Sequence, residues 1–331
     1  MKKLLKYFSL ALLAIILLFA GYFFVGSVES AKEITWGVNF SQKQAEALGL
    51  DWQETYLALF DDLGVRNLKL ITYWDLLEKD EGQYNFDDLD WQIKKANEYW
   101  AKVLLVIGMK TPRWPECHIP EWAKGLGKEE QQAEILKLLE KIVLRYKNES
   151  GIWAWQVENE PFFPFGECPR QDKDFLKKEI ALVKSLDDKN RPIIISDSGE
   201  FSFWITAAKL GDMVGTTLHR KVWFKELNRY VKYPLSPILY WRKSRIINVL
   251  FKKQVIVGEL QAEPWCLKYL NECPLLEQEK TMNFERFKEN IEFAKNTGLS
   301  QHYLWGAEWW YWMKEKRNKP EIWEEAKKLF K

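Results

Sequence analysis

Histidine and cysteine are scarce in this chain, which has three histidines and four cysteines among 331 residues. His118, His219 and His302 do not cluster with the cysteines along the sequence, and no C-x-x-C spacing occurs. Metal sites built from protein side chains usually need such clusters. The sequence therefore predicts no metal and no cofactor. A metal-dependent hydrolase is set aside because scattered histidines do not supply its ligands.

Net charge and low-complexity sequence are also nearly absent. The 49 Lys and Arg residues almost balance the 47 Asp and Glu residues, which leaves a formal charge of +2. This balance excludes the strongly basic field that is typical of nucleic-acid-binding proteins. After the N-terminal segment there is no internal repeat, low-complexity tract or Gly/Ser linker, so we expect one large globular domain.

Aromatic residues, in contrast, are abundant. The chain has 18 Trp, 13 Tyr and 19 Phe residues. Flat aromatic faces can stack against the apolar faces of sugar rings, and aromatic side chains also fill protein cores. The composition alone favours neither use.

The N-terminus predicts a membrane-spanning segment. Lys2, Lys3 and Lys6 precede an apolar run over residues 7–25 in which Ser9 is the only clearly polar member. The lysines should stay on the cytoplasmic side, so the rest of the chain should be extracytoplasmic. The length of the run favours an uncleaved anchor over residues 1–30. A cleaved signal peptide stays open, because small residues before Ala31 offer a cleavage site.

The four cysteines agree with export, because an oxidising compartment would pair an even number of loop cysteines. Cys266 and Cys273 lie in one predicted loop. Cys117 and Cys168 follow two predicted strands whose ends should be close in space. We therefore predict the disulfides Cys117–Cys168 and Cys266–Cys273.

Short apolar runs alternate with longer helical patterns along the chain, which indicates repeated βα units. The eight predicted strands are Ile34–Phe40, Asn67–Thr72, Lys102–Gly108, Ile152–Glu158, Pro192–Ser196, Met213–Thr217, Gln254–Glu259 and Gln301–Trp305. The clearest predicted helices are Asp51–Leu63, Asp88–Trp100, Glu129–Tyr146, Asp172–Leu186 and Asn283–Thr297. The stretch Lys221–Phe251 is less regular, and we interpret it as an enlarged loop followed by a helix.

Eight βα units are enough to close a parallel barrel, and about 250 residues is the usual length of such a domain. The predicted fold is therefore an α/β (β/α)₈ TIM barrel over residues 31–331, preceded by the N-terminal segment.

Two glutamates stand where predicted strands end, which is where barrel enzymes hold their chemistry. Glu160 follows the fourth strand and Glu259 ends the seventh. Cleavage of a glycosidic bond with retention needs one carboxylic acid and one carboxylate about 5–5.5 Å apart. We expect strands four and seven to face each other across the barrel, so that the two glutamates meet over its mouth.

Around these residues the chain resembles the clan A glycoside hydrolases, particularly families 5 and 42. Asn159-Glu160-Pro161 is similar to the strand-four motif that holds the acid/base, and Gly258-Glu-Leu-Gln261 is similar to the strand-seven context of the nucleophile. Gly64-Val-Arg-Asn-Leu-Lys-Leu70 and Glu81-Gly-Gln-Tyr-Asn-Phe-Asp87 look like the second strand and following loop of family 42. The resemblance covers residues 34–312 and implies that Glu160 is the acid/base and Glu259 the nucleophile.

The resemblance also implies supporting residues. Asn159 would bind the sugar 2-hydroxyl, Trp305 would lie beneath the sugar, and His219 would hydrogen-bond the nucleophile. Lys69 stands where the family usually has Arg, and a lysine cannot form the same bidentate fork. Further substrate-contact candidates are Trp74, Trp114, His118, Trp265 and Glu263, with Trp36, Asn39, Tyr73, Lys110, Arg113, Glu116, Trp309, Trp310 and Trp312 as additional lining residues.

Each glutamate has a nearby rival. Glu158 has the same strand parity as Glu160, so it could face inward and act as the acid. Glu263 could replace Glu259 as nucleophile, although its place beyond the strand favours substrate contact. For Glu158, a solvated or hydrogen-bonded structural glutamate is the alternative interpretation.

The predicted function is a retaining hydrolase of a β-linked glycan, with an oligosaccharide or polysaccharide as substrate and no nucleic-acid partner. A transglycosylase using the same glutamates and a non-catalytic carbohydrate-binding barrel stay open as alternatives.

Overall fold

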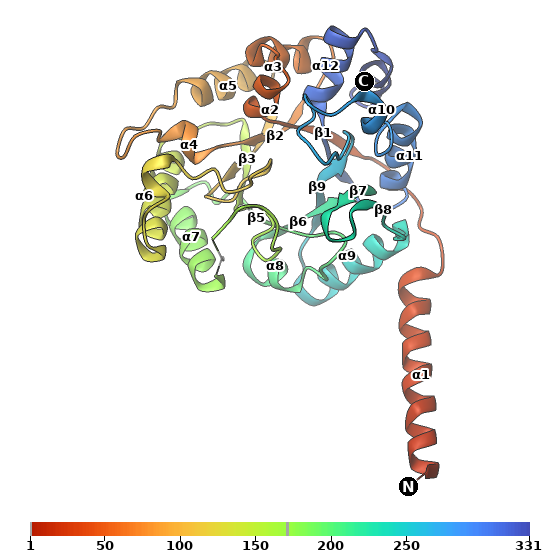
Figure 1. Ribbon diagram of the computed structural model, residues 1–331. Helices are drawn as coiled ribbons and strands as arrows, with labels where there is room; N and C mark the ends of the chain where they lie inside the picture. Colours follow the sequence, from red (N-terminus) through yellow and green to blue (C-terminus); the bar gives the residue numbers. More distant parts are fainter. Residues whose placement is uncertain (1, 170–171) are drawn as a thin grey trace.

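A computed structural model of the chain describes residues 2–169 and 172–331. Eight parallel strands form a closed barrel in the order β1-β10-β9-β6-β5-β4-β3-β2. Figure 1 shows this barrel end-on, with helices around its outside. The predicted (β/α)₈ barrel is therefore confirmed.

The barrel strands closely follow the predicted runs. They are β1 (Thr35–Phe40), β2 (Asn67–Ile71), β3 (Lys102–Ile107), β4 (Ile152–Val157), β5 (Ile193–Asp197), β6 (Met213–Leu218), β9 (Val255–Gln261) and β10 (Gln301–Trp305). Two ends differ from the prediction in a way that matters for the site. β4 stops at Val157, and β9 continues two residues beyond Glu259.

The longer helices cover the barrel from outside. The α-helices are α1 (Lys2–Phe24), α2 (Gln42–Ala47), α3 (Trp52–Asp61), α4 (Trp74–Leu77), α5 (Asp87–Glu98), α6 (Lys128–Tyr146), α7 (Lys173–Leu186), α8 (Ile205–Leu210), α9 (Pro237–Phe251), α10 (Leu275–Gln278), α11 (Phe284–Lys295), α12 (Ala307–Arg317) and α13 (Glu321–Lys327). Two 3₁₀ turns, η1 (Glu121–Ala123) and η2 (Lys225–Leu227), complete the set. Side chains of Asp51, Asp172 and Asn283 cap α3, α7 and α11 by accepting backbone N–H bonds.

The irregular stretch after strand six contains a feature that the sequence analysis missed. Residues 221–232 form an antiparallel hairpin of β7 (Lys221–Phe224) and β8 (Arg229–Lys232), and α9 follows it. Each strand has only four residues and mixed polarity, which is too short a run for a clear alternating pattern.

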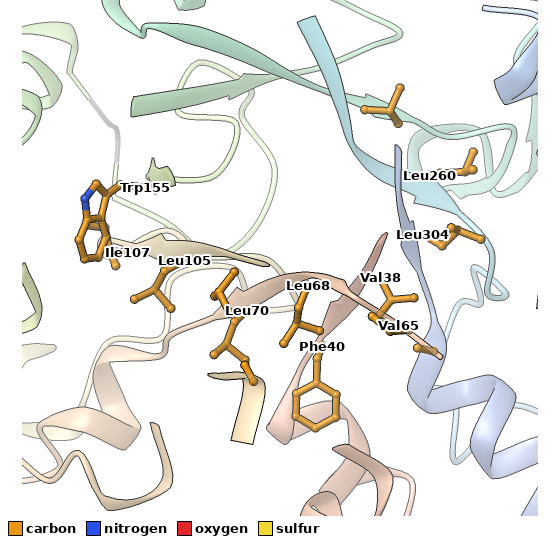
Figure 2. Close-up of a cluster of buried hydrophobic side chains, with 14 of the residues drawn as sticks. Val38, Phe40, Val65, Leu68, Leu70, Leu105, Ile107, Trp155, Leu260 and Leu304 are labelled. Atoms are coloured by element: carbon orange, nitrogen blue, oxygen red, sulfur yellow. The ribbon is translucent and has the colours of Figure 1, made fainter. Parts of the chain in front are cut away.

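Alternation along the barrel strands sorts side chains between two environments. Leu68 and Leu70 of β2 point outward into the main hydrophobic core, with Val38, Phe40, Leu105, Ile107, Trp155, Leu260 and Leu304 (Figure 2). Lys69, between them, is fully buried and contacts groups of β9 across the interior. Burial of each large apolar side chain contributes about 1.5–3 kcal/mol, so the outer layer holds the helices onto the barrel.

The barrel interior changes character along its axis. A layer of Leu104, Ala154, Ile194, Ile256 and Tyr303 is entirely apolar apart from one phenol. Closer to the carboxyl ends of the strands, the interior holds Asn39, Lys69, Gln156, Ser196 and Glu259, all buried. Buried polar groups need partners, so this second layer must be organised by hydrogen bonds.

Two disulfides brace the loops at the carboxyl ends of the strands. Cys117–Cys168 links the loops after β3 and β4, and Cys266–Cys273 closes a turn after β9. Both predicted pairings are confirmed. They hold the segments that surround Glu160 and Glu259.

The N-terminal helix α1 projects away from the barrel (Figure 1). Leu5–Phe24 is long and apolar enough to cross a membrane, with a mean hydropathy of 2.3. Its last turns contact the barrel domain: Phe23 is buried near Phe203, with ring centroids 5.6 Å apart, and Arg242 of α9 lies over the Tyr22 ring.

Candidate active site

Glu160 lies in the loop directly after β4, and its backbone places its side chain in the barrel mouth. Glu160 has φ +40°, a left-handed conformation that turns the chain sharply for a residue with a side chain. The Ser196 hydroxyl lies 2.8 Å from the Glu160 backbone nitrogen and accepts its hydrogen bond. Lys110 Nζ donates to the Glu160 carbonyl oxygen at 3.1 Å. The turn is thus held from β5 and from the loop after β3.

Glu158, two residues earlier, occupies a different environment. Its carboxylate accepts backbone N–H bonds of 2.7 Å from Met109 and Lys110, and it lies against Glu179 of α7. Glu158 and Glu179 line a small cavity between α6 and α7, outside the barrel. Gly108 has φ +127°, and a side chain there would also meet the Glu158 carboxylate, so glycine is favoured at this position.

The parity argument for Glu158 as a rival acid is therefore wrong. β4 ends at Val157, and Glu158 has φ +60°, so the alternation of strand side chains does not extend to it. We leave Glu158 out of the candidate site.

Glu259 lies within β9 and is paired with a buried lysine. Lys69 Nζ of β2 is 2.8 Å from Glu259 Oε1, and the two side chains are 0% and 7% exposed. Asn39 of β1 donates to the Gly258 carbonyl at 3.1 Å, which fixes the backbone just before Glu259. Lysine thus supplies a single charged contact where a guanidinium would offer a fork.

The two strands that hold Glu160 and Glu259 are not opposite each other, which corrects the sequence prediction. In the barrel order, β4 and β9 are three positions apart, and the strand opposite β4 is β10. Glu259 is nevertheless close enough for its charge to raise the pKa of Glu160.

Burial dominates the chemistry of Glu160. Removal from solvent raises the pKa of Glu160 well above its usual range, and the carboxylates of Glu259, Glu116 and Glu200 raise it further. A carboxyl group with this environment is neutral at a pH where an exposed glutamate is ionised. Such a group can donate a proton.

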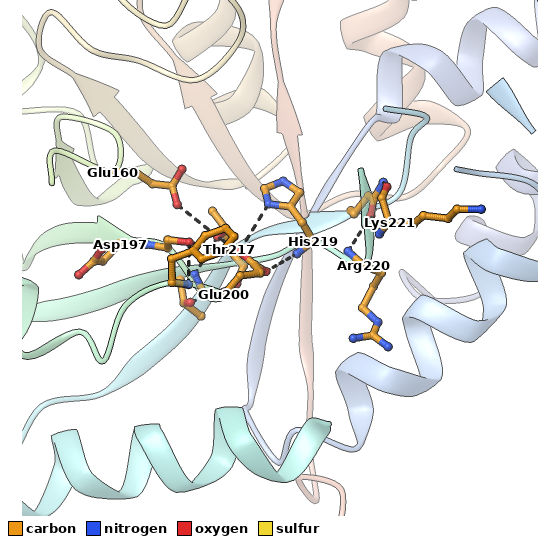
Figure 3. A network of polar contacts seen from close by, with 12 residues as sticks. Glu160, Asp197, Glu200, Thr217, His219, Arg220 and Lys221 are labelled. Carbon is orange, nitrogen blue, oxygen red and sulfur yellow. Dashed lines mark hydrogen bonds and ion pairs between the residues drawn. The ribbon is translucent and has the colours of Figure 1, made fainter. Parts of the chain in front are cut away.

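A hydroxyl connects Glu160 to a carboxylate that the sequence analysis missed. Thr217 Oγ1 lies 3.3 Å from Glu160 Oε1 and 3.1 Å from Glu200 Oε2 (Figure 3). One hydroxyl carries one proton, so both contacts form together when Glu160 is protonated and donates to Thr217, which donates to Glu200. Glu200 is three residues beyond the end of β5 at Asp197, so its position in the sequence did not mark it as a strand-end residue.

Glu116 is a further carboxyl group near the pair. Asn159 Nδ2 donates to Glu116 Oε2 at 3.1 Å, and Asn159 Oδ1 accepts from Gln156 and Ser196. Burial raises the pKa of Glu116 to about 7, with Glu259 contributing in the same direction. Asn159 is therefore fixed between β4, β5 and the loop after β3.

Both histidines among the predicted site residues have other partners. The His219 backbone N–H donates to Glu200 at 2.7 Å, and its ring packs edge-on against Trp265, with Nδ1 4.0 Å from Glu200 Oε2. His118 is 3% exposed and bonded at both ring nitrogens, to Lys43 and to the Arg113 carbonyl. His219 thus does not hydrogen-bond the nucleophile position in the described residues, and His118 supports the loop after β3.

Arg113 spans the mouth on the side of β10. Its guanidinium forms ion pairs with Glu263 after β9 and with Glu308 of α12, and lies 3.9 Å above the Trp305 ring. Burial raises the pKa of Glu308 to about 7. Glu263 is thus paired with Arg113, and the same guanidinium covers one face of Trp305.

The aromatic candidates separate into two groups. Trp74 is 1% exposed, donates to Glu78 and packs edge-on against Trp122 in the main core, so we leave it out of the site. Trp309, Trp310 and Trp312 of α12 are also buried in that core. Trp114 and Trp265, in contrast, both contact Phe165, with centroids 5.8 Å away in each case.

Phe165 belongs to an aromatic series that the sequence analysis did not identify. Phe163 stacks on Phe201 at 5.5 Å, and Phe201 meets Tyr233 at 5.5 Å. Phe163 and Phe165 follow Glu160 within Pro161-Phe-Phe-Pro-Phe165, and this density of aromatics beside the motif was the available signal. Exposed rings here, such as Phe201, can stack on apolar faces of a ligand.

Metal ligation has no candidate group in the described residues. Within residues 2–169 and 172–331, no set of three or more His, Cys, Asp or Glu side chains could hold a metal ion.

Comparisons with known proteins show likeness in structure but not in sequence. No protein-family model matches the chain, and no curated protein matches it. Among solved structures, a GH5_18 protein from Streptomyces cattleya in complex with GlcNAc has a TM-score of 0.59 and 12% identity, covering 83% of this chain and 71% of its own.

Two further structures broaden the comparison. Xylanase 10B from Thermotoga petrophila, in complex with xylobiose, has a TM-score of 0.53 and 15% identity, covering 85% of this chain and 86% of its own. A β-galactosidase from Halorubrum lacusprofundi has a TM-score of 0.55 and 14% identity, with 82% and 52% covered. At these identities the likeness establishes the fold, an eight-stranded parallel α/β barrel shared with clan A glycoside hydrolases.

Proposed function

We propose that this protein is a retaining glycoside hydrolase in which Glu160 is the acid/base and Glu259 is the nucleophile. The observation that carries the proposal is the contrast between the two carboxyl groups. Glu160 is buried among other carboxylates, which favours its neutral form, whereas Glu259 is held by the Lys69 ammonium. Paired carboxyl groups in unlike environments are the arrangement that acid and nucleophile roles require.

The chemistry follows from these protonation states. Neutral Glu160 donates its proton to the glycosidic oxygen as that bond breaks, and the Glu259 carboxylate attacks the anomeric carbon to form a glycosyl ester. Glu160, now ionised, takes a proton from water, which attacks the same carbon and releases Glu259.

The proposal draws support from what the structural neighbours act on. These neighbours include a xylanase, a β-galactosidase and GH5_18 proteins in complex with sugars. We therefore propose a β-linked oligosaccharide or polysaccharide as the substrate class. Trp114, Trp265 and Phe165 would contact it on the side of Glu160.

Azide rescue tests the two roles separately. Glu259→Ala should abolish the covalent intermediate, and azide should then yield a glycosyl azide of inverted configuration. Glu160→Ala should spare the first step for substrates with good leaving groups, and azide should yield a product of retained configuration. Wild-type hydrolysis with inversion, or a glycosyl adduct on Glu263, would overturn the assignment.

We further propose that residues 1–30 anchor the barrel domain, residues 31–331, on the extracytoplasmic side of a membrane. Support comes from the apolar Leu5–Phe24 helix behind basic residues and from two disulfides in the rest of the chain. Native protein should fractionate with membranes and keep residues 1–30. N-terminal sequencing that begins at Ala31 would replace the anchor with a cleaved signal peptide.

A further inference from the structure

A basic cavity lies next to the candidate active site and has no role in the proposed mechanism. Its volume is about 210 Å³, and it lies between the β7–β8 hairpin and α11. Four basic side chains line it: Arg220, Lys221, Lys232 and Arg286. Figure 3 shows Arg220 and Lys221 extending away from Glu160 beyond His219.

These four cations lack carboxylate partners in the described part of the chain. No ion pair recorded among residues 2–169 and 172–331 includes any of them, although neighbouring Lys280 pairs with Glu277 at 2.6 Å. The Arg286 Nε is buried without a hydrogen-bond partner. One acidic residue, Glu289, also lines the cavity, and it is exposed, as is Lys232. The cavity therefore contains an excess of positive charge.

The hairpin increases this excess instead of relieving it. Lys221 and Lys232 are directly opposite each other in the β7–β8 ladder. Like charges at opposed positions destabilise an antiparallel pair. Burial lowers the pKa of Lys221, and the charges of Arg286 and Lys232 lower it further. A bound anion would remove the repulsion among all three groups.

We propose that this cavity is an anion-binding site for a phosphate or sulfate group. Guanidinium groups bind such oxyanions through paired N–H donors, and lysines add point charges. Two guanidinium and two ammonium groups around one cavity supply donors from several directions, as a tetrahedral oxyanion requires. A metal cation would be repelled by the same groups.

The position of the cavity suggests what carries the anion. The backbone N–H groups of Arg220 and Lys221 donate to Gln261 Oε1 at 2.7 and 2.9 Å, and Gln261 is two residues beyond Glu259. The cavity is therefore attached to the same strand ends as the catalytic candidates. We infer that the phosphate or sulfate group is a substituent of an acidic glycan, an identification that rests on the proposed function.

Thermal unfolding of the full chain in phosphatidylcholine nanodiscs tests the site without any activity measurement. Sodium phosphate should raise the Tm of the wild type above its value in sodium chloride of equal ionic strength. The double variant Lys232→Gln/Arg286→Gln should lose this rise. Lys225→Gln, at the exposed end of the same hairpin and outside the cavity, should keep it. Without phosphate, Lys232→Gln alone should raise the Tm, because it removes the opposed like charge.

Three probes then identify the carrier. Glucose 6-phosphate should raise the Tm where glucose does not, if a glycan carries the group. If a lipid headgroup carries the group, phosphatidylglycerol in the nanodiscs should raise the Tm and glucose 6-phosphate should not. If inorganic phosphate is the only probe that raises the Tm, the ligand is the free ion. An equal rise in wild type and double variant, or no rise with any probe, would overturn the site. The variant Glu259→Gln should respond as the wild type, so this result is separate from the test of catalysis.

Discussion

Two buried carboxyl pairs lie on opposite sides of the barrel wall at the end of β4. Glu160 faces the interior, near Glu259, and Glu158 faces the outer helices, against Glu179. Burial raises the pKa of both Glu160 and Glu158. The pairs differ in their partners. Glu158 is held by two backbone N–H groups, whereas the Glu160 carboxyl contacts the Thr217 hydroxyl and has its pKa raised by three carboxylates.

This comparison shows that a perturbed pKa does not identify a catalytic residue by itself. Structural ion-pair networks also perturb pKa values, and burial raises the pKa of Glu158 and Glu179 as well as that of Glu160. What separates Glu160 from Glu158 is access to the mouth and proximity to the Lys69–Glu259 pair. The predictions below test that separation.

Substitution of the two β4-end glutamates should give the largest difference. Glu160→Gln keeps the shape but removes the transferable proton, so kcat for a poor leaving group should fall by about 10²–10⁴-fold. Glu158→Gln should change kcat by less than about tenfold, because its carboxylate lies outside the barrel. Steady-state kinetics on aryl glycosides of graded leaving-group pKa would measure both. Leaving-group dependence that appears in Glu158→Gln instead would reverse the assignment.

Breaking the Lys69–Glu259 pair should reduce stability strongly. Lys69→Met leaves a buried carboxylate without its cation, which costs about 3–5 kcal/mol in comparable buried pairs. Lys95→Met, which removes the exposed pair with Glu98, is the matched control and should cost less than about 1 kcal/mol. Urea unfolding measures both. Equal losses for the two variants would show that the Lys69 contact is not formed.

The outer pair, Glu158 and Glu179, should make the free energy of unfolding depend on pH. Burial, followed by the charge of Glu158, raises the pKa of Glu179 well above its usual 4.5. A carboxyl group with a raised folded-state pKa contributes stability below pH 4.5 that is lost as pH rises through the folded-state pKa. Glu179→Gln keeps a donor without titrating, so its stability relative to wild type should increase between pH 5 and 8. The expected slope is at most about 1.4 kcal/mol per pH unit.

That slope comes from the free energy of unfolding measured by urea at several pH values. Glu98→Gln, which changes an exposed carboxylate on α5, provides the control and should show no such gain. If the difference in unfolding free energy between Glu179→Gln and wild type does not change with pH, the pKa of Glu179 is not raised in the folded state.

The smallest effect should come from Glu200. Its charge raises the pKa of Glu160, so Glu200→Gln should lower that pKa and move the alkaline limb of kcat/KM to lower pH. The shift should be at most about one pH unit, since Glu200 is only one of three contributing carboxylates. A pH profile of kcat/KM measures it, with Glu98→Gln again as control. An unchanged alkaline limb would separate Glu200 from the acid.

The fold was predicted from local patterns in the sequence, whereas the catalytic roles of Glu160 and Glu259 stay predictions. Strand runs such as Asn67–Ile71 are local patterns of apolar residues, and each was predicted to within two residues of its observed bounds. The disulfide Cys117–Cys168 followed from the expected closeness of neighbouring strand ends. The hairpin at residues 221–232 was not predicted, because its strands are too short to show a periodic pattern.

The sequence by itself determined which residues could form strands and helices, because alternation and helical periodicity depend on neighbours within a few positions. It could not determine the direction of Glu158, since one left-handed φ angle reverses the parity of the strand. Nor could it determine that Arg113 would cover Trp305 or that Glu200 would contact Thr217. These contacts join residues of different βα units, and the Arg113–Glu308 ion pair likewise joins residues that are 195 positions apart. Only closure of the barrel brings such side chains within reach of each other.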